Sequence, residues 1–77
     1  MNREQVLLEV GARVREHRKA HGWSQEVLAE LSGVARLYIS QIETGSRNLS
    51  VIYLLLLAKS LDVEPSQLLP DLRTADQ

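Results

Sequence analysis

The chain has 77 residues and a mass of 8.7 kDa, enough for one small domain with one core. It contains no cysteine, which excludes disulfides, a thiolate nucleophile and a cysteine-based zinc site. The longest apolar run, residues 51–58, is too short for a membrane span of about 20 residues, so no membrane partner is expected. The first residues lack the apolar segment of a secretory signal, which favours a cytoplasmic location.

The net charge of −1 argues mildly against nucleic acid as a partner, because nucleic-acid-binding domains are commonly basic. The distribution of the charges weakens that objection. Residues 1–47 carry seven positive and six negative side chains, whereas residues 48–77 carry two positive and four negative ones. A local basic face can still bind phosphate, since salt screens charges more than about 8 Å away at physiological ionic strength.

The spacing of apolar residues predicts an all-α chain. From Gln5 to Ala20 apolar residues recur three and four positions apart, which indicates an amphipathic first helix. Ser24 is predicted to cap a second helix that stops before Gly33. A third helix is predicted over residues 35–44 and ends at Gly45, which suits the left-handed conformation after a helix.

Two more helices are predicted in the second half of the chain. Ser50 can cap a fourth helix over Val51–Leu61, and Pro65 suits the first position of a fifth helix that Pro70 stops. Residues 70–77 then form a polar tail. We therefore expect a single five-helix domain over residues 1–77, with its folded core over residues 5–69.

The predicted fourth helix is apolar on two sides. At about 100° per residue, one side is predicted to face the core, and it consists of Val51, Leu54, Leu55, Ala58 and Leu61. The other side consists of Ile52, Tyr53 and Leu56, and these residues are predicted to form a homodimer interface together with Leu49 just before the helix. The alternative is that helices one and five of the same chain cover this side.

The stretch from Gln25 to Ile42 has the pattern of a helix-turn-helix, with Ala29 at the close approach and Gly33 in the turn. Val34 and Ile39 are predicted to be buried, together with Ile42. Across residues 7–69, the segments GARVREHRKAHGWSQEVLAE, YISQIETGSRN and LLAKSLDVEPSQL resemble the Cro/C1-type family, also called XRE-like regulators. The resemblance implies a compact lambda-repressor-like fold and sequence-specific binding to double-stranded DNA.

The resemblance also implies roles for individual residues. The helix over residues 35–44 corresponds to the recognition helix that lies in the major groove. Its predicted base contacts are Ala35, Arg36, Leu37 and Gln41. The predicted contacts to the DNA backbone are Ser24, Gln25, Tyr38, Ser40, Arg47 and Asn48. Arg18 and Glu43 match a structural ion pair of the family.

Within the family, the segment RLYISQIETGSRNLS resembles controller proteins of restriction–modification systems. Those proteins are small homodimers, and the resemblance implies a dimer on a pseudo-palindromic operator. A general repressor of the same architecture remains open as an alternative. So does an antitoxin-type regulator that also binds a toxin protein.

Two other classes of function are an enzyme and a protein–protein adaptor. The sequence has no glycine-rich phosphate loop, zinc-ligand set or catalytic Ser/His/Asp grouping, so we expect neither an enzyme nor a bound cofactor or metal. No small-molecule effector site is evident either. A protein–protein adaptor that does not bind DNA is the remaining alternative, and it predicts binding that depends little on salt.

Overall fold

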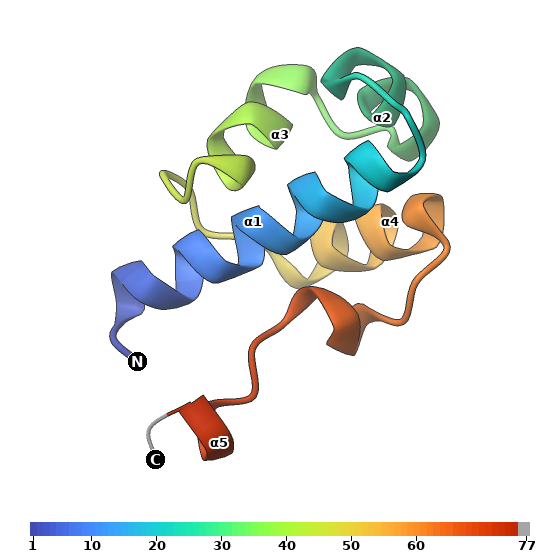
Figure 1. The fold of residues 1–77 in the computed structure, drawn as a ribbon. Coiled ribbons are helices and arrows are strands. Elements are labelled where there is room, and N and C mark those ends of the chain that lie inside the picture. The colour runs from blue at the N-terminus through green and yellow to red at the C-terminus, as the bar shows by residue number, and fades with distance from the viewer. Residues whose placement is uncertain (76–77) are drawn as a thin grey trace.

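The computed structural model describes residues 1–75, and this part of the chain contains helices and no strands. Its body consists of α1 (Arg3–Ala20), α2 (Gln25–Ser32), α3 (Arg36–Glu43) and α4 (Val51–Leu61). A short 3-10 helix, η1 (Pro65–Leu68), and a single helical turn, α5 (Leu72–Ala75), follow. Figure 1 shows α2 and α3 together on one side of the long α1, with η1 on its other side. The prediction of an all-α fold is confirmed.

The helix starts follow from local capping. Ser24 and Ser50 cap α2 and α4 as predicted, each accepting a backbone N–H with its hydroxyl oxygen. The first helix begins at Arg3 rather than at the predicted Gln5. The reason is a capping box: Asn2 Oδ1 accepts from the N–H of Gln5 while Gln5 Oε1 accepts from the N–H of Asn2, both at 2.8 Å.

Two left-handed residues set the turns that end α2 and α4. Gly33 has a φ of 75°, which glycine adopts without steric cost, and it lets the chain turn directly into α3. Asp62 has a φ of 58° and occupies the same kind of position after α4. Aspartate tolerates this conformation better than most side chains, so the turn forms without glycine.

The predicted fifth α-helix is wrong in type. Residues 65–68 form the 3-10 helix η1, and Leu69 after it is extended, with φ −116° and ψ 137°. Pro70 explains this, because a proline disfavours the helical conformation in the residue before it. Leu68 is nevertheless fully buried, so η1 still closes the core. The predicted polar tail continues as α5, and its residues 76–77 lie outside the described residues.

One apolar core joins the four α-helices and η1. Its buried residues are Val14, Leu28, Val34, Ile39, Ile42, Leu57, Ala58, Leu61 and Leu68. The predicted burial of Val34, Ile39 and Ile42 is therefore confirmed. The predicted core side of α4 is partly wrong, since Val51 and Leu55 are exposed and Leu57 is fully buried. The elements α1, α2 and η1 all pack against α4, and the residues of α4 that become buried are Leu57, Ala58 and Leu61.

Gly11 lies where α1 crosses the end of α3. A Cβ atom at this position would overlap the carbonyl oxygen of Ile42 and lie 2.8 Å from that of Glu43. We expect Gly11→Ala to lower the free energy of unfolding by about 1–3 kcal/mol, because the backbone of α3 must shift. Urea denaturation followed by circular dichroism measures this.

In an unconstrained helix, alanine is favoured over glycine by about 1 kcal/mol. The free energy of unfolding of Gly11→Ala should therefore rise if helix propensity dominates and fall if the close approach to α3 dominates. Ala12→Gly at the exposed neighbouring position measures the propensity contribution alone. A stabilised Gly11→Ala protein would show that the two helices are further apart than described.

Candidate nucleic-acid interface

The N-terminal end of α3 presents an open surface. Ala35, Arg36 and Leu37 are exposed, and Gln41 further along the helix is half-buried. Ala35 occupies the N-cap position and makes no side-chain hydrogen bond, so the first N–H groups of α3 have no side-chain cap. The structure thus brings three of the four predicted base-contacting residues to one free end of a helix.

The Arg36 side chain lies against the start of α2. Its Nη1 donates to Gln25 Oε1 at 3.3 Å, and its Nε lies 3.6 Å from Glu26 Oε1. The side chain is still 52% exposed, so solvent weakens the ion pair and the guanidinium can exchange partners at little cost. The contact with Glu26 could not be predicted from the sequence, because no residue pattern determines how side chains on two helices meet.

Gln25 links this arginine to the interior. Its Nε2 donates to Glu43 Oε1 at 3.1 Å while its Oε1 accepts from Arg36. Both ends of the side-chain amide are therefore occupied within the protein. The Ser24 hydroxyl oxygen accepts from the N–H of Val27 at 3.2 Å, and its O–H can still donate. The first backbone N–H groups of α2 have no partner within the helix, so this end can also offer them to a phosphate.

Arg18 and Glu43 form a buried ion pair between α1 and the end of α3. Arg18 Nε and Nη2 donate to the two carboxylate oxygens at 2.8 and 2.9 Å, and only 9% and 3% of the two side chains is exposed. Arg18 Nη1 also donates to the carbonyl of Trp23 at 2.7 Å. The hydrogen bond to Glu43 raises the pKa of Arg18 above its ordinary value, against the opposing effect of burial. This pair therefore holds the C-terminal end of α3 against α1.

The segment between α3 and α4 brings together three of the predicted backbone-contacting residues. Tyr38 is half-buried, and its hydroxyl donates to the carbonyl of Asn48 at 2.9 Å. The guanidinium carbon of Arg47 lies 4.7 Å from the centre of the Tyr38 ring. Arg47 and Asn48 are exposed beside it, and Ser40 on α3 is half-buried.

The predicted dimer residues fall into two groups. Leu49 and Tyr53 are half-buried against the core of their own chain, whereas Ile52 is 68% exposed and Leu56 is also exposed. Val51 and Leu55 join the exposed group. We call Val51, Ile52, Leu55 and Leu56 the α4 apolar face. Leu31 of α2 is exposed as well, and it lines a hollow together with Leu56.

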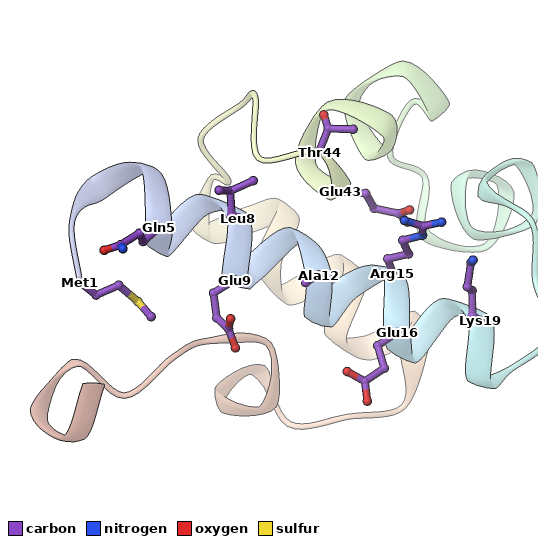
Figure 2. Close-up of a pocket in the computed structure, with 10 residues that line it drawn as sticks. All are labelled: Met1, Gln5, Leu8, Glu9, Ala12, Arg15, Glu16, Lys19, Glu43 and Thr44. Atoms are coloured by element: carbon purple, nitrogen blue, oxygen red, sulfur yellow. The ribbon is translucent and has the colours of Figure 1, made fainter. Parts of the chain in front are cut away.

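An open groove of about 1090 Å³ runs along α1 (Figure 2). Its apolar floor includes Leu8 and Ala12, and charged side chains such as Glu9, Arg15 and Lys19 border it. Only Glu43 and Thr44 reach it from α3 or just beyond its end. None of the predicted base-contacting or backbone-contacting residues lines the groove, so it is separate from the free end of α3.

The helices of the described residues are all too short or too polar to cross a bilayer. The sequence model of the family described as Helix-turn-helix matches residues 14–68, which span α2, α3 and the turn at Gly33. The chain belongs to the XRE-like helix-turn-helix family. In this domain, α2 and α3 are the two helices of the motif, and α3 is the helix with the open end.

Individual relatives cover most of the chain. The control protein C.SmaI of Serratia marcescens is 39% identical over 69 residues, which is 90% of this chain and 79% of that protein. The restriction–modification controller C.AhdI from Aeromonas hydrophila is 50% identical, with a TM-score of 0.78 over 80% of this chain and 94% of that one. SinR, a master regulator for biofilm formation solved in complex with DNA, is 38% identical, with a TM-score of 0.74 over 77% of this chain and 95% of that one. These relatives are regulators and not enzymes.

Proposed function

We propose that this protein is a sequence-specific double-stranded DNA-binding transcriptional regulator that acts as a homodimer. In this proposal, α3 enters the major groove, and the two subunits read half-sites about 34 Å apart in a pseudo-palindromic operator. The observation that carries it is the open N-terminal end of α3, where Ala35, Arg36 and Leu37 are exposed together. The relative SinR, solved in complex with DNA, supports duplex DNA as the partner.

The proposed contacts divide into those that read sequence and those that position the protein. Arg36 can grip guanine O6 and N7 with two donors, while Ala35 and Leu37 can contact thymine methyl groups. Gln41 contributes further along the helix. The backbone contacts, which fix the register, come from Ser24, Gln25, Tyr38, Ser40, Arg47 and Asn48.

The α4 apolar face supports the homodimer. Four large apolar side chains in adjacent turns of one helix are exposed in the isolated chain, and soluble proteins rarely leave such a face uncovered. A second copy presents the same face, so a two-fold axis would cover both at once. We propose the α4 apolar face as the dimer interface. We also propose that the protein acts in the cytoplasm, where it would meet its operator.

The relatives also suggest a first operator to test. C.AhdI is a restriction–modification controller and C.SmaI is named a control protein. We therefore propose that the operator lies upstream of restriction–modification genes. Footprinting on such a promoter tests this, and a general repressor would instead protect an unrelated promoter.

Selection of binding sites from random duplex DNA tests the proposal directly. The wild-type protein should enrich a two-fold-related motif, and its affinity should fall steeply as salt rises, because phosphate contacts release counterions. A protein that enriches no motif and whose partner binding is insensitive to salt would be an adaptor and not a regulator of this kind.

Arg36→Ala should lose preference at one base pair in each half-site. We expect a loss of about 1–3 kcal/mol in discrimination there, with the remaining positions read as before. Selection repeated with the variant, followed by titration of single-base substitutions, measures it. Arg15→Ala, which removes an exposed arginine from α1, is the matched control and should leave base preference unchanged. Full discrimination retained by Arg36→Ala would assign base reading to other residues.

A further inference from the structure

Tyr53 of α4 is packed against Tyr38 of α3. The two ring centres lie 4.5 Å apart and the planes meet at 82°, an edge-to-face arrangement. Both residues are half-buried and pack against the core. The contact therefore joins the helix proposed to form the dimer to the helix proposed to enter the DNA groove.

Tyr38 in turn contacts the two exposed residues of the connecting segment that are proposed to bind phosphate. Its hydroxyl donates to the carbonyl of Asn48 at 2.9 Å, and its ring lies 4.7 Å from the guanidinium carbon of Arg47. Arg47 forms no ion pair with a carboxylate of the described residues. The Tyr38 ring is thus the contact that orients its charge, through a cation–π interaction.

The backbone of Tyr53 is held in place at the start of its helix. Its backbone N–H donates to the Ser50 hydroxyl, the N-cap of α4, at 3.1 Å. Its own hydroxyl makes no hydrogen bond among the described residues, so the ring and not the hydroxyl makes the contact with Tyr38. The ring carried at this point packs against the edge or face of Tyr38 and so limits the rotamers open to Tyr38.

We infer that Tyr53 is a positioning residue for the contact with the DNA backbone. By fixing the Tyr38 ring, it holds Arg47 and Asn48 in the geometry in which they meet a phosphate. The inference rests on the proposed DNA-binding function and adds to it a residue that does not itself reach the duplex. It also gives Tyr53 a role inside its own subunit, whereas the sequence predicts it at the dimer interface.

The test compares Tyr53→Leu with Tyr53→Phe, which keeps the ring and removes only the unpaired hydroxyl. The first measurement is the NMR chemical shift of the Arg47 side-chain protons in the free protein, which the Tyr38 ring current moves upfield. The second is the salt dependence of binding to a mixed-sequence DNA duplex, followed by fluorescence anisotropy. Arg47→Ala and the double variant Tyr53→Leu/Arg47→Ala complete the set. Circular dichroism checks that each variant is folded, and Tyr53→Met replaces Tyr53→Leu if the latter does not fold.

We expect Tyr53→Leu to move the Arg47 shifts toward those of a flexible chain. It should also lower the slope of log affinity against log salt by about 1 for each bound subunit, as Arg47→Ala does. Tyr53→Phe should retain both properties. The double variant should have the slope of Arg47→Ala alone, because the two substitutions remove the same contact.

Two results would overturn the inference. One is a folded Tyr53→Leu protein with the wild-type Arg47 shifts. The other is a double variant in which the two losses of slope add, which would mean that Tyr53 acts independently of Arg47. A wild-type protein that does not bind the duplex at any salt concentration rejects the proposed function instead, and the NMR comparison still decides whether Tyr53 positions Arg47.

Discussion

Arg18→Met is expected to lower the free energy of unfolding by about 3–5 kcal/mol. The substitution keeps an unbranched side chain in α1 but leaves the buried carboxylate of Glu43 without its cation and the carbonyl of Trp23 without a donor. Only the amide of Gln25 still donates to the carboxylate, and one neutral donor does not compensate a buried charge. Chemical denaturation of the wild-type and variant proteins measures the difference.

Arg36→Met is the matched control for this prediction. It also replaces an arginine that contacts a glutamate, but this contact joins α3 to α2 at the surface, where the arginine and glutamate side chains are 52% and 67% exposed. An exposed pair contributes about 0–1 kcal/mol, so the control should remain near wild-type stability. Similar losses in the two variants would mean that Glu43 gains water or a new partner once Arg18 is absent.

A large part of this fold could be predicted from the sequence because the signals are local. Ser24, Gly33 and Ser50 act on the backbone within a few residues of themselves, so their roles as caps and turn do not depend on the rest of the molecule. The same reasoning missed the start of α1. The spacing of apolar residues alone predicts a start at Gln5, whereas the capping box of Asn2 and Gln5 starts the helix at Arg3.

Local sequence signals could not predict which side of α4 faces the core. Its first eight residues are all apolar, so the pattern has no polar side to show which residues face outward. A helical wheel drawn on such a run leaves the direction of the core undetermined. It is the packing of α1, α2 and η1 that decides it, burying Leu57 and leaving Leu55 in solvent.

The side-chain contacts around α3 could be predicted only in part from the sequence. The family resemblance pairs Arg18 with Glu43, and the structure adds the two carboxylate contacts and the carbonyl of Trp23. The link from Glu43 through Gln25 to Arg36 has no counterpart in sequence spacing, because it joins side chains of two helices across a turn. Two hydrogen bonds of Gln25 thus join the buried pair to the proposed base-reading arginine.

Leu55→Glu is expected to yield monomers and to weaken operator binding by about 100- to 10,000-fold. Leu55 is 51% exposed within the α4 apolar face, so the new carboxylate costs the isolated subunit little. At a two-fold interface, however, each substitution is present twice, and the two charges would be buried close together. A monomer engages one half-site and loses the effective concentration that joins the two binding events. Sedimentation equilibrium and anisotropy with the selected operator measure the two effects.

Leu8→Glu provides a matched control, because Leu8 is 56% exposed but lies on α1, away from the α4 apolar face. It carries the same substitution and the same change of charge, and it should remain dimeric with operator affinity near that of the wild type. A dimer that survives Leu55→Glu but not Leu8→Glu would move the interface to the groove along α1. If Leu55→Glu is monomeric yet binds the operator as tightly as the wild type, the pairing of half-sites does not depend on a preformed dimer.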